Sequence, residues 1–111
     1  MKLQLIRLLL YEVIVTYPQY DRLVSFASVH HGLRAEKLLA AAGIEAAAAP
    51  TPREVDISCG QCLLFAGKDE QRVLALLETN NVRWSKLFNR DGRSKIYDLI
   101  RMYDFRRAQW D

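Results

Sequence analysis

The sequence predicts a small α+β domain in which helices pack against a single β-sheet. Three observations predict this fold class. The chain has 111 residues, about the size of one domain, and half of them are apolar, which is enough for one core. Short runs of strand-forming residues alternate with longer amphipathic stretches. The charged fraction of 26% is that of an ordinary globular protein, so a folded chain is expected.

The first predicted elements are a buried strand at residues 22–27 and a helix at residues 29–42. Ser28 offers an N-cap side chain to this helix, and Gly43 is a natural C-cap. Its alanines favour a helix, and its larger apolar residues are expected on one buried face. These residues are Leu33, Leu38 and Leu39.

Two more strands, a helix and a fourth strand are predicted next. The second strand is expected at residues 44–49, although its four alanines are poor strand formers. A clear strand follows at residues 60–66, an amphipathic helix at 68–80 and a looser strand at 82–88. The order strand, helix, strand, strand, helix, strand is that of the ferredoxin-like βαββαβ sandwich. That fold hosts many functions, so it does not by itself decide this one.

Both ends of the chain lie outside this plan. Residues 1–19 are expected to form an N-terminal appendage, residues 20–89 the ferredoxin-like domain, and residues 90–111 an extra, basic C-terminal helix. The helix is predicted at residues 95–107, because four apolar residues of that stretch fit one face. They are Ile96, Leu99, Ile100 and Tyr103.

Charge and hydropathy exclude several classes of function. A formal net charge of +3 is too small to indicate nucleic acid, and aromatic Phe65 and Trp84 are expected in the core rather than stacked on bases. The most apolar run, residues 3–15, is interrupted by Arg7 and Glu12 and is shorter than the ~20 residues of a membrane span. No signal peptide is recognised, so a cytoplasmic location is expected.

Cys59 and Cys62 are the two cysteines of the chain, and two residues separate them. A close pair in an otherwise ordinary chain indicates a reducing compartment and a redox, sulfur-handling or metal role. Both are therefore candidate catalytic residues, with thiolate attack at one sulfur and resolution by the other. The alternative for Cys62 is a small core residue of the strand, packed beside Leu64.

The predicted topology brings the start of the first helix to the connection between the second and third strands. Ser28, His30 and His31 are therefore expected near the loop that holds Arg53, Ser58 and Cys59. The helix start would favour a thiolate by ~0.3–1 kcal/mol, whereas lowering a thiol pKa by two units takes about 2.7 kcal/mol. A second positive group is needed, and Arg53 or a protonated histidine is the candidate.

A zinc site of both cysteines with His30 and His31 is not expected. Adjacent helical residues point ~100° apart, so the two histidines do not converge on one tetrahedral ion. The prediction for a metal is none.

Two stretches of the sequence resemble the selenium/sulfur (Se/S) carrier protein-like family. Residues 26–39 are similar to its helix opening, and residues 50–60 are similar to its Pro-Arg-Glu…Ser-Cys-Gly signature. The resemblance covers about residues 22–88. It implies a small cytoplasmic bacterial domain in which Cys59 carries sulfur or selenium as a persulfide or selenosulfide, with no other cofactor. Arg53 matches the arginine of the motif.

The same resemblance implies protein partners. A donor enzyme such as a cysteine desulfurase would load Cys59, and an acceptor protein would take the atom, so a carrier is expected rather than a stand-alone enzyme. His30 or His31 corresponds to the histidine at the helix start, whereas Cys62 exceeds the motif. Two alternatives remain: a dithiol redox protein that uses both cysteines, and an interaction or metal-binding module. The sequence leaves open a homo-oligomer and the choice between sulfur and selenium.

Overall fold

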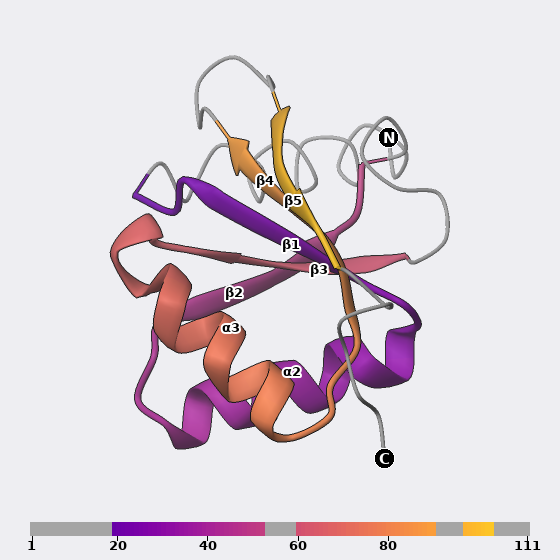
Figure 1. Cartoon of the computed structure of the whole chain (residues 1–111), viewed down its shortest axis with the longest axis vertical. Helices are drawn as coiled ribbons and strands as arrows, with labels where there is room; N and C mark the ends of the chain where they lie inside the picture. Colours follow the sequence, from indigo (N-terminus) through magenta and orange to yellow (C-terminus); the bar gives the residue numbers. More distant parts are fainter. Residues whose placement is uncertain (1–18, 53–59, 91–96, 104–111) are drawn as a thin grey trace, which may run out of the picture.

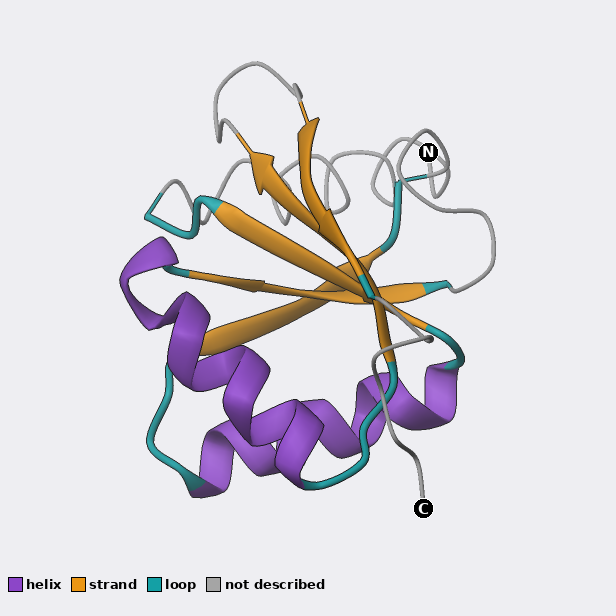
Figure 2. Cartoon of the chain, viewed as in Figure 1, coloured by secondary structure: helices purple, strands orange, loops and turns teal. Residues whose placement is uncertain are grey.

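The computed structural model describes residues 19–52, 60–90 and 97–103. Their five strands form one antiparallel sheet in the order β2-β3-β1-β4-β5, and helices α2 and α3 lie together on one face of it (Figures 1 and 2). The elements are β1 Arg22–Phe26, α2 Val29–Ala41, β2 Ala46–Pro50, β3 Gln61–Phe65, the 3-10 helix η1 Gly67–Asp69, α3 Glu70–Thr79, β4 Trp84–Arg90 and β5 Tyr97–Met102.

The predicted order of elements from β1 to β4 is confirmed. The strand at residues 44–49 forms as β2, shifted to Ala46–Pro50, in spite of its alanines. β2 pairs with β3 along its whole length, from Ala46 opposite Phe65 to Pro50 opposite Gln61. Backbone pairing at the edge of the sheet therefore outweighs the weak strand propensity of alanine.

The helix predicted at residues 95–107 is wrong, because Tyr97–Met102 form the strand β5. β5 pairs antiparallel with β4, and a bulge between Leu87 and Phe88 interrupts their register. Without β5, the backbone groups on the outer side of β4 would be unpaired. Tyr103 follows the last residue of the strand; its backbone N–H donates to Ser85 O at 2.9 Å, and its side chain is buried. Leu99 and Ile100, which suggested a helix together with Tyr103, are exposed, so these three residues do not share a buried face.

Apolar residues fill both faces of the sheet, in the alternation expected of strands. On the face covered by the helices, the main cluster includes Val24, Leu63, Phe65 and Trp84. The alternate residues of the same strands form a second cluster on the other face, and these include Leu23, Cys62, Leu64 and Phe88.

Leu33 was expected on the buried face of its helix, and that prediction is wrong. The buried residues of α2 are Gly32, Ala35 and Leu39. Leu33 is 46% exposed. Gly32 explains why this side of the helix faces the sheet, because the position that a Cβ would occupy there lies only 3.4 Å from Phe26 Cδ2. α2 therefore rests on the sheet through small residues and turns Leu33 outward.

Candidate functional site

The described ends of the β2–β3 connection lie side by side. Pro50 pairs with Gln61, and Thr51 N donates to Gly60 O at 3.1 Å. Arg53, Ser58 and Cys59 belong to residues 53–59, outside the described part of the chain. Of the cysteine connection, the structure therefore describes the two flanks.

The start of α2 lies at the same end of the sheet as these flanks. Ser25 near the end of β1 is opposite Cys62 near the start of β3, so the chain leaves β1 beside the strand that follows the connection. Gln61 Nε2 donates to Glu36 Oε2 at 3.3 Å, which ties the first residue of β3 to α2. The described flanks thus lie beside α2, whereas the predicted approach of Ser28 and His30 to Arg53, Ser58 and Cys59 falls on residues outside the described ranges and stays a prediction.

Ser28 is the N-cap of α2, as predicted. Its backbone is extended, with φ −158°, and its side chain accepts a hydrogen bond from His31 N at 3.4 Å. Its carbonyl oxygen also accepts from Gly32 N at 3.1 Å. The first turn that it caps contains no acidic residue, although acidic side chains are favoured there.

The two histidines at the start of α2 have different environments. His30 is exposed, whereas His31 is partly buried and its Nδ1 accepts the backbone N–H of Arg83 at 3.1 Å. Burial lowers the pKa of His31, and the charges of His30, Arg34 and Arg83 lower it further. His31 is therefore held as a neutral acceptor that links α2 to the chain entering β4. Sequence reasoning missed Arg83 because nothing local marks it.

Acidification should reveal this role of His31. The unfolded chain has a histidine pKa of 6.5 and the folded chain a lower one, so the unfolded state binds the proton first. The stabilisation by neutral His31 is thus complete above pH 6.5 and is lost as the pH falls toward the folded pKa. We expect His31→Asn to unfold with less pH dependence between pH 7.5 and 5 than the wild type, in urea titrations. His30→Asn is the matched control and should keep most of that dependence; equal slopes for all three proteins would contradict this assignment.

Cys62 is fully buried on the sheet face opposite the helices. Its Sγ lies 3.8 Å from Pro50 O, and the thiol can donate to that carbonyl. The cavity beside it is only about 10 Å³ and is lined in part by Pro52 and Arg90. Arg90 is itself buried, and its Nη1 donates to Tyr20 O at 2.6 Å. The thiol predicted to resolve an intermediate on Cys59 is therefore enclosed by the core.

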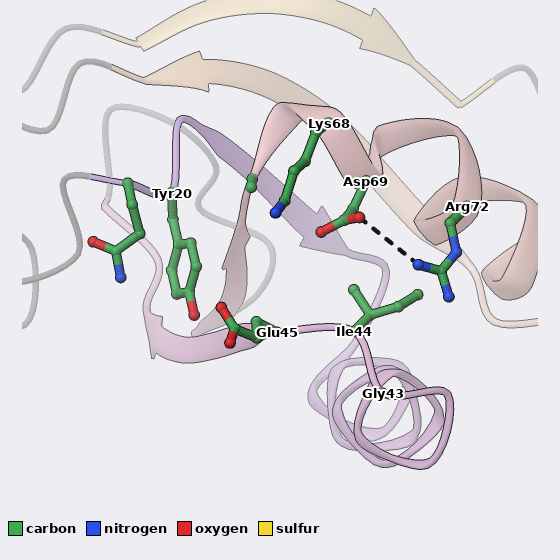
Figure 3. A pocket seen from close by; sticks show the side chains of 9 residues that line it. Tyr20, Gly43, Ile44, Glu45, Lys68, Asp69 and Arg72 are labelled. Carbon is green, nitrogen blue, oxygen red and sulfur yellow. Dashed lines mark ion pairs between the residues drawn. The ribbon is translucent and has the colours of Figure 1, made fainter.

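A larger pocket of about 460 Å³ lies at the opposite end of the sheet (Figure 3). Phe65 at the end of β3 pairs there with Arg22 and Ala46, the first residues of β1 and β2. Charges of both signs line the pocket, and Asp69 and Arg72 form an ion pair at 3.9 Å. The other lining residues are Gln19, Tyr20, Gly43, Ile44, Glu45, Ala66 and Lys68. Of the predicted site residues that the structure describes, none lines this pocket.

The described residues contain neither a cluster of metal ligands nor a helix that could span a membrane. No three or more His, Cys, Asp and Glu side chains gather there as metal ligands. In the same ranges, no helix has the length and apolar character to cross a membrane.

Comparison with known proteins adds one finding. No curated protein and no solved structure matches the chain. The sequence profile of one family matches residues 21–89, from the residue before β1 to the last but one residue of β4. Because this match covers more than half of the 111 residues, the chain belongs to the family described as "Putative Se/S carrier protein-like".

Proposed function

We propose that this protein is a sulfur or selenium carrier that holds the atom on Cys59 and passes it to an acceptor protein. The observation that supports this function is the family match, because residues 21–89 include Cys59 and both strands that flank its connection. A carrier also implies at least two protein partners, one that loads Cys59 and one that unloads it. The ferredoxin-like plan is the fold that we assign to the matched residues.

The proposed transfer is a thiol–persulfide exchange. The Cys59 thiolate attacks the outer sulfur of a donor persulfide, the S–S bond of the donor breaks, and a new S–S bond forms on Cys59. The inner sulfur of the donor, its own cysteine sulfur, leaves as a thiolate and takes up a proton, so no external oxidant or reductant is consumed. Arg53, Ser58 and the start of α2 are the groups that we assign to stabilising the thiolate. The helix contributes ~0.3–1 kcal/mol of this, so Arg53 has to contribute the larger part.

The burial of Cys62 favours the carrier over a dithiol redox protein. A Cys59–Cys62 disulfide needs the two sulfur atoms about 2 Å apart. Cys62 is 0% exposed and packs on the sheet face opposite the helices, with its Sγ beside Pro50 O. Attack by or on this sulfur therefore requires the packing on this face to open. The second thiol of a working exchange pair would be accessible without such an opening.

Loading of Cys59 is the direct test. The reduced protein is incubated with a cysteine desulfurase and cysteine, trapped by alkylation and analysed by peptide mass spectrometry. We expect one added sulfur atom on the peptide containing Cys59. Cys59→Ser should lose the adduct, whereas the matched variant Cys62→Ala should retain it. No adduct on the wild type, while a known carrier protein is loaded in parallel, would refute the proposal.

A further inference from the structure

The solvent face of α2 combines apolar and basic side chains. Val29 and Leu33 are 49% and 46% exposed, and their i, i+4 spacing makes them neighbours on this face. The side chains around them are His30, Arg34 and Lys37, and all three are exposed. We call these five residues the α2 surface. The acidic neighbour on this side of the helix is Glu36, whose carboxylate accepts from Gln61. Single exposed apolar residues are common, but an adjacent pair with three basic neighbours is a pattern that needs an explanation.

The basic side chains of the α2 surface lie near the start of the helix, where acidic side chains would be stabilising. The positive end of a helix favours acidic residues in its first turn, and α2 has none there. Arg83 also lies at this end, because its backbone N–H donates to His31 Nδ1, and its side chain carries a further positive charge. Besides burial, the charges of His30, Arg34 and Arg83 lower the pKa of His31, so among the described residues the charges that act on this ring are positive. Local departures from a stabilising rule are expected where a surface serves function.

The α2 surface is held in a fixed position beside the flank of the cysteine connection. Glu36, one turn from Leu33, accepts from Gln61 Nε2 at 3.3 Å, and Gln61 follows Gly60 directly. Arg34 Nη2 donates to Asn80 O at 3.1 Å, which anchors the arginine to the end of α3. A molecule that covers Val29 and Leu33 would therefore lie next to the described end of that connection.

We propose that the α2 surface docks an acidic face of the enzyme that delivers sulfur to Cys59. This inference rests on the proposed carrier function. Val29 and Leu33 form the apolar centre that a protein interface buries, and the basic residues around them pair with carboxylates of the partner. Nucleic acid is less well matched, because two aliphatic side chains form the centre of the α2 surface and phosphates offer nothing to them, and the ring of His30 is the single aromatic group among these five residues.

The experiment compares two sulfur donors on the same set of variants. The rate of persulfide formation on Cys59 is measured with a cysteine desulfurase plus cysteine, and separately with glutathione persulfide, which needs no docking surface. The test variants are Leu33→Glu and Lys37→Glu, both at exposed positions. The matched control is Lys68→Glu, a charge reversal at the opposite end of the sheet. Thermal unfolding verifies that each variant is folded.

We expect Leu33→Glu and Lys37→Glu to slow loading by the desulfurase about 10-fold or more, and to leave loading by glutathione persulfide unchanged. Lys68→Glu should match the wild type with both donors. Raising the salt from ~50 to ~300 mM should slow the desulfurase reaction of the wild type more than that of Lys37→Glu.

Other outcomes overturn the inference. Loading by the desulfurase that is unaffected by both variants, or lost equally with both donors, would show that the α2 surface does not dock the enzyme. Glutathione persulfide that loads the wild type while the desulfurase does not would exclude the desulfurase as the partner. Inhibition by a short single-stranded RNA, abolished in Leu33→Glu, would assign the surface to nucleic acid. If neither donor loads Cys59, the proposed function itself fails, and the inference fails with it.

Discussion

Replacing Trp84 by alanine should lower the free energy of unfolding by about 3–5 kcal/mol. Trp84 is 1% exposed and is the largest of the fully buried side chains. The ring of Tyr103 packs edge-on against it, with centroids 5.3 Å apart and an angle of 85°, and the guanidinium of Arg101 lies 5.7 Å from its centroid. These contacts attach the end of β5 to the sheet. The substitution therefore leaves a cavity in the core and also removes the aromatic contacts that hold an edge strand.

Trp84→Phe is the matched control for this prediction. The indole Nε1–H is buried and has no hydrogen-bond partner in the described structure, which is itself unfavourable. Phenylalanine retains an aromatic ring for Tyr103 and removes this unpaired donor, so it should cost much less than alanine. Denaturant titrations give the free energies, and hydrogen exchange of the Tyr103 amide reports whether β5 detaches. Equal losses for both variants would show that the indole ring is not what holds β5.

The strand at Tyr97–Met102 shows where reasoning from the sequence failed. Leu99 and Ile100 with Tyr103 fit a helical period, and over so few residues that period competes with strand pairing on nearly equal terms. The strand forms because its backbone pairs with β4 and because the ring of Tyr103 packs against Trp84, and both contacts depend on distant parts of the chain. From β1 to β4, by contrast, each element carries enough local pattern to be predicted, and the differences are shifts of one or two residues.

The candidate site divides in the same way. The cap of Ser28 and the arrival of α2 beside the β3 flank follow from local residue types and from topology, and sequence reasoning predicted them. The contact of His31 with Arg83 joins residues 52 apart, and no local signal announces it. The exposure of Leu33 could not be predicted from the sequence either, because it depends on how closely Gly32 approaches Phe26. Packing against the sheet, rather than helical period alone, decides which side of α2 is available to a partner.

The second large effect is expected in the reactivity of Cys62. Its thiol is 0% exposed and belongs to the core cluster on the sheet face opposite the helices, so alkylation has to wait for the protein to open. Small domains have folding equilibrium constants of about 10³ or more, so the native thiol should react at least ~1000-fold more slowly than the unfolded one. Iodoacetamide labelling of the Cys59→Ser variant, with and without urea, measures this ratio on a single thiol.

The outcome of that labelling decides how a loaded carrier is emptied. If Cys62 is protected, its thiol is closed to molecules in solution, and we expect the sulfur on Cys59 to leave by attack from an acceptor thiol that approaches from outside. The route of release is then set by docking rather than by an internal disulfide. Labelling of the native protein at a rate close to that in urea would mean that the second sheet face opens readily, and the dithiol redox function would replace the carrier as the better proposal.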